Sequence, residues 1–243
     1  MLLLFPILRR LLFTAAFLAI PVVAGELVAR KLIGSAVTHA VQARIGVAPK
    51  LGFGSTPLLV QLVHGKLDAV SVSAAGARFD GLPPLSLSAT LRDVHLRDLT
   101  SLQGAIGSLS VDAQLAPAGV RELLATPGCV DSLPPSLLAE LTPRPRVILL
   151  PGRVDLLPQH GRRGEVRLRP YASGASVRFA IIGLEIDGTP ASGAQLAEAR
   201  ARTRCARALS KLPFGISLVS ASATAGALDL VFSGSGASFS AVS

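Results

Sequence analysis

The stretch Leu85-Ser86-Leu87-Ser88-Ala89-Thr90-Leu91 alternates strictly between apolar and small or polar side chains. Successive side chains on a β-strand point to opposite faces of the sheet, so the alternation predicts one apolar face and one hydrated face. The same pattern returns at 66–74 and 106–115. The apolar phase slips between Leu91 and Val94, which predicts either a bulge or the end of that strand.

Outward from this stretch, the chain predicts closely spaced strands and a few helices. Apolar positions at helical spacing predict helices at 26–45, 117–125, 133–141 and 191–211. The segment 52–65 is expected to be a turn with a short apolar run. Further strands are expected at 147–157, 165–169, 176–187, 214–223 and 228–232, before a Ser/Gly tail. Strands without long alternating helices indicate an antiparallel sheet, hence an α+β fold, and we expect residues 26–243 to form a single domain.

The N-terminal residues read as an export signal. Arg9 and Arg10 precede an uncharged run from Leu11 to Gly25, of about 15 residues, which is shorter than the roughly 20 that span a bilayer. Val22-Val23-Ala24 resembles the small-residue pattern before a signal-peptidase cut, but the apolar start of the chain is unusual for a signal peptide. Residues 1–25 are therefore expected to be either a signal peptide or an N-terminal membrane anchor. The rest is expected on the periplasmic side of the cytoplasmic membrane, in the cell envelope.

The amino-acid composition indicates which classes of molecule the protein is expected to bind. Half of the 243 residues are hydrophobic, but only 4% are aromatic and tryptophan is absent, so the apolar surface is mainly aliphatic. Binding of single-stranded nucleic acid normally uses aromatic side chains beside basic ones, so nucleic acid is not expected as a partner. The formal charge of +9 and the export signal favour an anionic lipid, or the surface of an anionic membrane. The helix at 26–45 is expected either to pack on the sheet or to rest its cationic side on such a membrane.

Cys129 and Cys205 are the two cysteines of the chain. In an exported protein a pair of cysteines favours a disulfide over a metal site or a nucleophile. This bond would close a long loop and stabilise the fold by about 4 kcal/mol in the chain-entropy model. The alternative is two unpaired buried thiols.

No motif in the chain predicts catalysis, a metal site or a cofactor. The serines include no G-x-S-x-G motif, and Asp93 and Asp98 beside His95 fit exposed positions at a strand end better than an acid–base pair. Four histidines lack the spacing of zinc ligands: His39, His64, His95 and His160. The guanidinium group suits phosphate, and from charge alone Arg162 and Arg163 are candidates for contact with a lipid head group.

Two stretches resemble a known family. In the first, Pro57-Leu58-Leu59, Gln61-Leu62 and Gly65 stand before Ala69-Val70-Ser71-Val72; the second is Leu212-Pro213-Phe214-Gly215-Ile216. Together they resemble the LmeA-like family of bacterial cell-envelope phospholipid-binding proteins. The family's run is of the type G-F-P-F-L-x-Q-L-x-x-G-x-x-x-x-V-x-V. This chain departs from it with Thr56 before the proline and Leu58, rather than phenylalanine, after it.

The resemblance implies a fold, a ligand and a lining. The family is similar to tubular lipid-binding domains, in which a curved antiparallel sheet wraps around a long helix and an apolar groove. It implies a non-enzymatic protein that binds phospholipid or an anionic glycolipid and supports envelope lipid or lipoglycan assembly. The apolar residues of the two stretches are the candidates for the lining of that groove: Phe53, Leu58, Leu59, Leu62, Phe214 and Ile216.

Two other functions stay open. A fully packed domain without lipid could act as a structural or accessory scaffold for an envelope biosynthetic enzyme such as a glycosyltransferase. An esterase or glycan hydrolase is the third hypothesis, because an acid–base pair needs no local motif.

Overall fold

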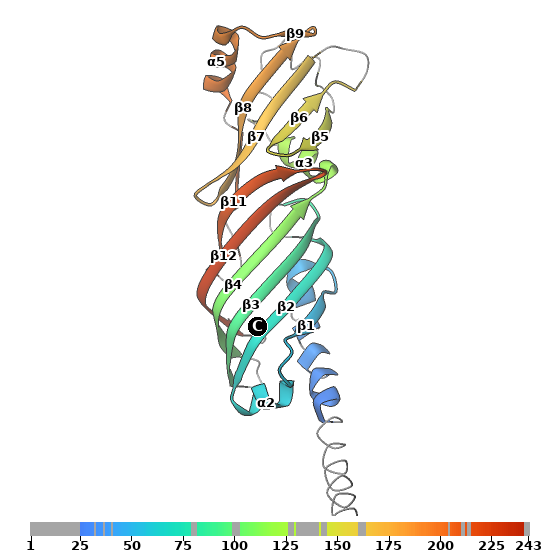
Figure 1. Ribbon diagram of the computed structural model, residues 1–243, viewed down its shortest axis with the longest axis vertical. Coiled ribbons are helices and arrows are strands. Elements are labelled where there is room, and N and C mark those ends of the chain that lie inside the picture. The colour runs from blue at the N-terminus through green and yellow to red at the C-terminus, as the bar shows by residue number, and fades with distance from the viewer. Residues whose placement is uncertain are drawn as a thin grey trace, which may run out of the picture.

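The computed structural model describes residues 25–31, 33–35, 37–39, 41–78, 82–98, 103–125, 129, 141, 145–159, 164–203, 205–209, 212 and 215–240. These residues form two antiparallel sheets that follow one another along the long axis of the molecule (Figure 1). The predicted α+β class with antiparallel sheets is confirmed. Both sheets are open, because each ends in two edge strands.

The first sheet has the strand order β1-β2-β3-β4-β12-β11. Its strands are long, and β2, β3, β4 and β12 pair with their neighbours over most of their length. Their bounds are β1 Lys50–Phe53, β2 Lys66–Ala77, β3 Leu85–Asp98, β4 Gln103–Leu115, β11 Ser217–Thr224 and β12 Ala227–Ser240.

The second sheet has the strand order β10-β8-β7-β6-β5, and β9 pairs with β8. Its bounds are β5 Arg146–Leu150, β6 Arg153–Leu157, β7 Gly164–Ser173, β8 Ser176–Ile186, β9 Thr189–Pro190 and β10 Ala206–Ala208. The two sheets meet where two hairpin turns exchange backbone hydrogen bonds. The N–H of Gly152 donates to the carbonyl of Ala223 (2.8 Å), and the N–H of Gly226 donates to that of Leu149 (3.3 Å).

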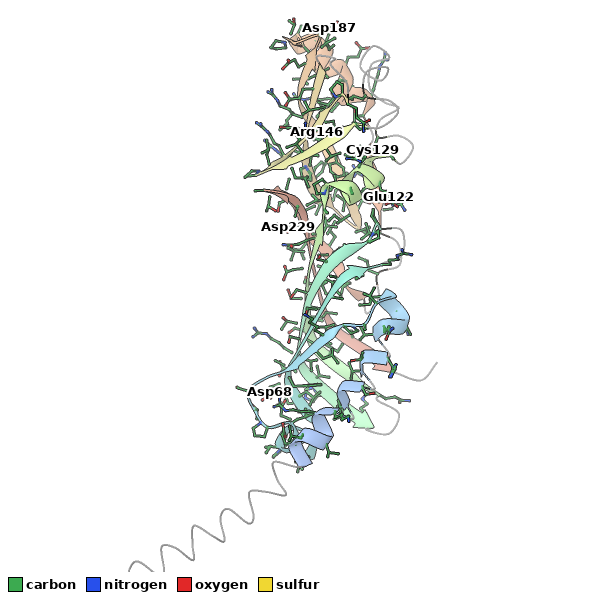
Figure 2. The ribbon with its side chains drawn as sticks, turned by 90° about the vertical axis from the view of Figure 1, so that its right-hand side faces the viewer. Asp68, Glu122, Cys129, Arg146, Asp187 and Asp229 are labelled. Atoms are coloured by element: carbon green, nitrogen blue, oxygen red, sulfur yellow. A yellow bond between two sulfur atoms is a disulfide. The ribbon has the colours of Figure 1, made fainter. Side chains whose placement is uncertain are left out.

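Helices cover parts of both sheets. Residues 25–45 are helical at every described position, which confirms the helix expected there. The others are α2 Leu58–Val63, α3 Pro117–Leu124 and α5 Gly193–Arg202. Figure 2, turned by 90°, shows the helix at 25–45 beside one face of the first sheet. No helix in the described ranges is both long enough and apolar enough to cross a membrane.

The alternation of apolar and polar residues, as at 85–91, gives the first sheet its two faces. On β4, Ile106, Leu109, Val111, Ala113 and Leu115 are buried, while the side chains between them are mostly exposed. We call the buried side the inner face. It belongs to one apolar core that continues into the second sheet, where Val154, Val166, Val177 and Ile181 are also buried.

Several expected boundaries were wrong. The strand expected at 147–157 is the hairpin of β5 and β6, because Gly152 turns the chain with φ 76°. The helix expected at 191–211 ends at Arg202, since Cys205 is held by a disulfide and β10 pairs with β8.

The two remaining corrections concern the ends of the first sheet. The expected Ser/Gly tail is largely the second half of β12, where small residues continue the pairing with β4 as far as Ser240. The segment 52–65 holds the end of β1 and the helix α2, rather than only a turn. The helix expected at 133–141 lies outside the described residues except Leu141, which is helical and buried.

Candidate functional site

The inner face of the first sheet is organised in rows of apolar side chains that cross the strands. Residues paired between neighbouring antiparallel strands share a face, so their side chains lie next to one another. One complete row passes through Leu51, Val72, Ala89, Val111, Phe232 and Leu218. An apolar surface therefore extends from one edge of the sheet to the other without a polar side chain in that row.

The neighbouring row, which we call the Phe53 row, joins the two stretches that resemble the family. It runs by strand pairing through Phe53, Val70, Leu91, Leu109 and Gly234. Ile216, directly before β11, fills the space left by the missing side chain, because a Cβ on Gly234 would lie 2.9 Å from its Cγ2. Phe53 and Ile216 thus stand at opposite edges of one row, although 163 positions separate them in the chain (216 − 53).

A crease crosses the inner face beside the Phe53 row. Inward-facing residues are two apart along most of each strand, but three apart between Leu91 and Val94 and between Ile106 and Leu109. Asp93 has φ 53°, and a Cβ on Gly107 opposite it would lie 2.7 Å from the Cβ of Asp93. The register of β3 with β4 continues unchanged through this point. The phase slip in the sequence is therefore a crease in a continuous strand, and not the expected inserted bulge or strand end.

Gln61 joins α2 to the sheet beyond this crease. Its side chain is buried, its Nε2 donates to the carbonyl of Thr56 (2.7 Å), and its Oε1 accepts from the N–H of Asp68 (2.8 Å). A buried amide with both ends satisfied fixes the loop before α2 to the start of β2. This gives the glutamine of the family-like stretch a structural role.

Glu26 connects the N-terminal helix to α2. Its carboxylate accepts from the N–H groups of Leu58 (2.7 Å) and Leu59 (2.9 Å), and from Nε of Arg30 (2.6 Å). These hydrogen bonds, first from Leu59, then from Leu58 and Arg30, lower the pKa of Glu26 from 4.5 to about 2. At the other end of the helix, the carbonyl of Ile45 accepts from the N–H of Arg78 (2.9 Å), just after β2. The helix is thus tied to α2 near one end and to the residue after β2 near the other.

A ladder of charges lies on the second sheet. Nε of Arg167 donates to Glu165 (2.7 Å), and Nε of Arg153 donates to Asp155 (3.2 Å). Burial raises the pKa of Asp155, against the attraction of Arg153, whereas the hydrogen bond from Arg167 lowers the pKa of Glu165. Asp155 Oδ1 is buried without a hydrogen-bond partner. The pairs are internal to the sheet, and they bring no nucleophile beside a base.

The predicted disulfide between Cys129 and Cys205 is present. Both cysteines are buried, and they border a small hollow with Leu124, Leu156, Val166, Leu168 and Thr203. The lining of the hollow is mostly apolar. A disulfide is compatible with an exported protein.

The predicted lining residues fall into three groups. Phe53, Leu59 and Leu62 are partly buried, and Ile216 is buried next to Gly234. Leu58 is completely buried, with 0% of its surface exposed. Phe214 and the head-group candidates Arg162 and Arg163 lie outside the described residues.

Sequence reasoning missed the two polar residues that hold this region together. Glu26 was counted only as the first residue of a helix, and Gln61 only as part of a motif. A glutamine inside an apolar run of six residues was a usable signal, because such an amide must find partners when it is buried. Nothing local marked Glu26, whose backbone partners are 32 and 33 positions away. Within the described ranges, no cluster of His, Cys, Asp and Glu could hold a metal ion.

Comparison with known proteins gives one positive finding. No curated protein and no solved structure matches the chain. A family model described as LmeA-like phospholipid-binding matches residues 24–233. This range includes the helix at 25–45, the row from Leu51 to Leu218, all of the Phe53 row except Gly234, and all of the second sheet. The chain belongs to the LmeA-like phospholipid-binding family, which is described by its ligand rather than by a catalysed reaction.

Proposed function

We propose that this protein is an exported, non-enzymatic phospholipid-binding protein that holds acyl chains against the inner face of its first sheet. The observation that carries the proposal is the uninterrupted apolar surface of the inner face, together with the family's phospholipid binding. Burial of acyl carbons contributes about 0.8 kcal/mol per CH₂, so a shallow aliphatic groove suffices for tight binding.

The groove lies between the helix at 25–45 and the sheet. Apolar side chains on both sides are only partly buried: Ala29, Ile33 and Val41 on the helix, and Leu51, Phe53, Leu62, Leu91 and Leu96 opposite. An acyl chain that lies between two incompletely covered apolar surfaces buries apolar area on both of its sides. Phe53, Leu59, Leu62, Phe214 and Ile216 contribute to the wall, and Leu58 supports it from behind.

In this proposal the curved first sheet wraps around the N-terminal helix in the manner of a tubular lipid-binding domain. The ties at Glu26 and Ile45 support it, because they hold the helix near both of its ends. Between them, Ala29, Ile33 and Val41 are only partly buried against the core.

The protein works in the cell envelope, on the periplasmic side of the cytoplasmic membrane. Residues 1–25 direct export, as a signal peptide or as a retained anchor, and residues 26–243 form one lipid-binding domain. The disulfide and the uncharged run from Leu11 to Gly25 support this location. The bound lipid is a phospholipid or an anionic glycolipid, and the protein supports the assembly of envelope lipids or lipoglycans.

Arg162 and Arg163 are proposed to contact the anionic head group. The motivation is charge alone, since two adjacent arginines stand between β6 and β7. The double substitution Arg162→Glu with Arg163→Glu should weaken binding to vesicles that contain phosphatidylglycerol at low salt. Unchanged binding in a sedimentation assay would remove both residues from the site.

The rival function is a packed scaffold for an envelope biosynthetic enzyme, without bound lipid. One observation favours it: five inner-face residues are already buried by the protein itself, namely Val72, Ala89, Val111, Phe232 and Leu218. An inner face that is already covered by protein would need no lipid. Recovery of the protein with an enzyme, and without extractable lipid, would support the scaffold.

The deciding experiment is native mass spectrometry, with organic extraction, of the protein purified from its own envelope. We expect a stoichiometric phospholipid or glycolipid. Phe53→Ser should lower the bound lipid, whereas Lys50→Ser, on the outer face of the same strand, should not. A stable, lipid-free protein that takes up no added phospholipid would contradict the proposal.

A further inference from the structure

One end of the molecule carries exposed aliphatic side chains on two adjoining helices. Among the described residues, six large hydrophobic side chains are exposed, and four of them are here: Leu27 (65%), Val28 (57%), Val60 (50%) and Val63 (84%). We call these four residues the tip patch. Figure 1 shows α2 and the start of the N-terminal helix together at this end, and Asp187 marks the opposite end in Figure 2.

The two halves of the tip patch are held together rather than being independent surface residues. The Glu26 carboxylate accepts hydrogen bonds from the first turn of α2, and a Cβ on Gly25 would lie 3.1 Å from Cδ1 of Leu59. The first turn of the N-terminal helix therefore lies against the first turn of α2. Leu27 and Val28 on one helix, and Val60 and Val63 on the other, form one local surface.

Unlike an ordinary surface helix, α2 carries apolar side chains on both of its sides. Its inward side carries Leu58, the half-buried Leu62 and the buried amide of Gln61. Its outward side carries Val60 and Val63, three apart and so on one face, where polar residues are normally found. Gathered apolar side chains that a fold leaves in water mark an interaction surface.

The sequence next to the tip patch indicates what covers it. The uncharged run from Leu11 to Gly25 ends two residues before Leu27. If that run is retained in the bilayer, the helix that begins at Gly25 places Val28 three residues further on, about 5 Å along the helix axis from the membrane. The charges nearby suit a lipid surface as well: Lys31 is exposed, while the carboxylate of Glu26 is paired with Arg30.

We propose that the tip patch is a membrane-docking surface that inserts into the boundary between head groups and acyl chains of a phospholipid bilayer. The inference goes beyond lipid binding on the inner face, because it assigns a second surface and a second partner, the bilayer itself. It also predicts an orientation, in which the end of the molecule that carries the first turn of the N-terminal helix and α2 faces the membrane.

Tryptophan fluorescence tests the proposal in the full chain, which contains no tryptophan of its own. Val60→Trp and Val63→Trp each place one reporter in the tip patch. Val219→Trp on β11 is the matched control, because Val219 (57% exposed) is as accessible as Val60 (50%) but lies outside the patch. Each variant is bound to vesicles of phosphatidylcholine and phosphatidylglycerol, with and without brominated acyl chains.

We expect brominated chains to quench the tryptophans at 60 and 63 strongly, with a shift of their emission to shorter wavelength, and to leave the one at 219 unchanged. Val60→Asp with Val63→Asp should weaken vesicle binding by about tenfold. Absence of quenching at 60 and 63, or equal quenching at all three positions, would overturn the proposal. The outcome is separate from that of lipid extraction, since a chain without bound lipid can still dock, and a lipid-loaded chain can fail to dock.

Discussion

The two sheets cover their apolar faces in different ways. The second sheet carries covalent and ionic links, namely the Cys129–Cys205 disulfide and the ladder of Arg153, Asp155, Glu165 and Arg167. It also carries the helix α5, which buries Ala199. The first sheet relies on strand pairing and on a helix that is tied near its ends. Half-buried apolar residues occur on both sheets: the large ones on the inner face of the first include Phe53 and Leu91, and those of the second include Ala172 and Ile186.

Under the proposed function, this difference separates stability from lipid binding within one continuous core. A surface that opens for a lipid must have a low cost of opening, so it cannot also be held by a disulfide or a dense charge network. The hydrogen bonds between the two hairpin turns connect the second sheet, which carries the disulfide, to the first. The family-like stretches are joined by the Phe53 row on the first sheet, which has no disulfide among its described residues.

Removal of the disulfide should have the largest effect. Cys129→Ser with Cys205→Ser opens a loop of 76 residues, so the free energy of unfolding should fall by about 4 kcal/mol. Hydrogen exchange should increase first in β8 and β10, while β2 to β4 keep their protection. Reduction of the unmodified protein is the control and should give the same pattern. Equal loss of protection in both sheets would remove the distinction between them.

Truncation of one apolar residue in each sheet should lower the free energy of unfolding by less than removal of the disulfide does. The loss should differ between the two sheets. Val166→Ala, at a completely buried position of β7, should lower the free energy of unfolding by about 2 kcal/mol, and Leu91→Ala, which is half-buried, by about 1 kcal/mol. The order should reverse for lipid: extraction should recover less phospholipid from Leu91→Ala and the usual amount from Val166→Ala. Equal lipid in both variants would remove Leu91 from the groove.

Much of the fold followed from the sequence because its strongest signals are local. The alternation at 85–91 predicted the sheet and its two faces, and two cysteines in an exported chain predicted the disulfide. The boundaries failed where long-range contacts override local preference. Residues 203–209 are alanine- and arginine-rich, and in isolation they would continue α5, but Cys205 and the pairing of β10 with β8 end the helix.

The candidate site was predictable in part for the same reason. The motif-like stretches named Phe53 and Ile216, but strand pairing alone shows that they share a row. The tip patch gave no signal, because Val60 and Val63 look like ordinary core residues until the burial of Gln61 shows which side of α2 faces inward. Small residues such as Gly234 and Ser235 suggested a tail, since their strand character comes only from β4 beside them.

The two ends of the molecule can be compared directly through two Glu–Arg pairs at helical spacing. Glu26–Arg30 and Glu198–Arg202 are both i, i+4 pairs with a closest distance of 2.6 Å, but only Glu26 also accepts two hydrogen bonds from α2. Its pKa of about 2 is below the ordinary 4.5, so its stabilising effect is complete above pH 4.5 and is lost as the pH falls toward 2. Glu26→Gln should remove that acid dependence from thermal melting curves.

The same substitution should release α2. In Glu26→Gln the amide hydrogens of Leu58 and Leu59 should exchange faster at neutral pH, and vesicle binding through the tip patch should weaken. Glu198→Gln is the matched control, and it should leave the exchange of both amides and the vesicle binding unchanged. If both variants behave alike, the link between the N-terminal helix and α2 is an ordinary surface ion pair.

The smallest effect is expected within the charge ladder, where two neighbouring carboxylates should respond to pH with opposite signs. Burial raises the pKa of Asp155, so its contribution is most favourable below its unfolded pKa of 3.8 and declines as the pH rises through the folded pKa. The pKa of Glu165 is lowered by Arg167, so its contribution is present above 4.5 and lost in acid. Asp155→Asn should therefore raise the melting temperature slightly at pH 7, while Glu165→Gln lowers it. A loss of stability in both variants would mean that the hydrogen bond from Arg153 outweighs the burial of Asp155, and that the ladder stabilises the second sheet as a whole.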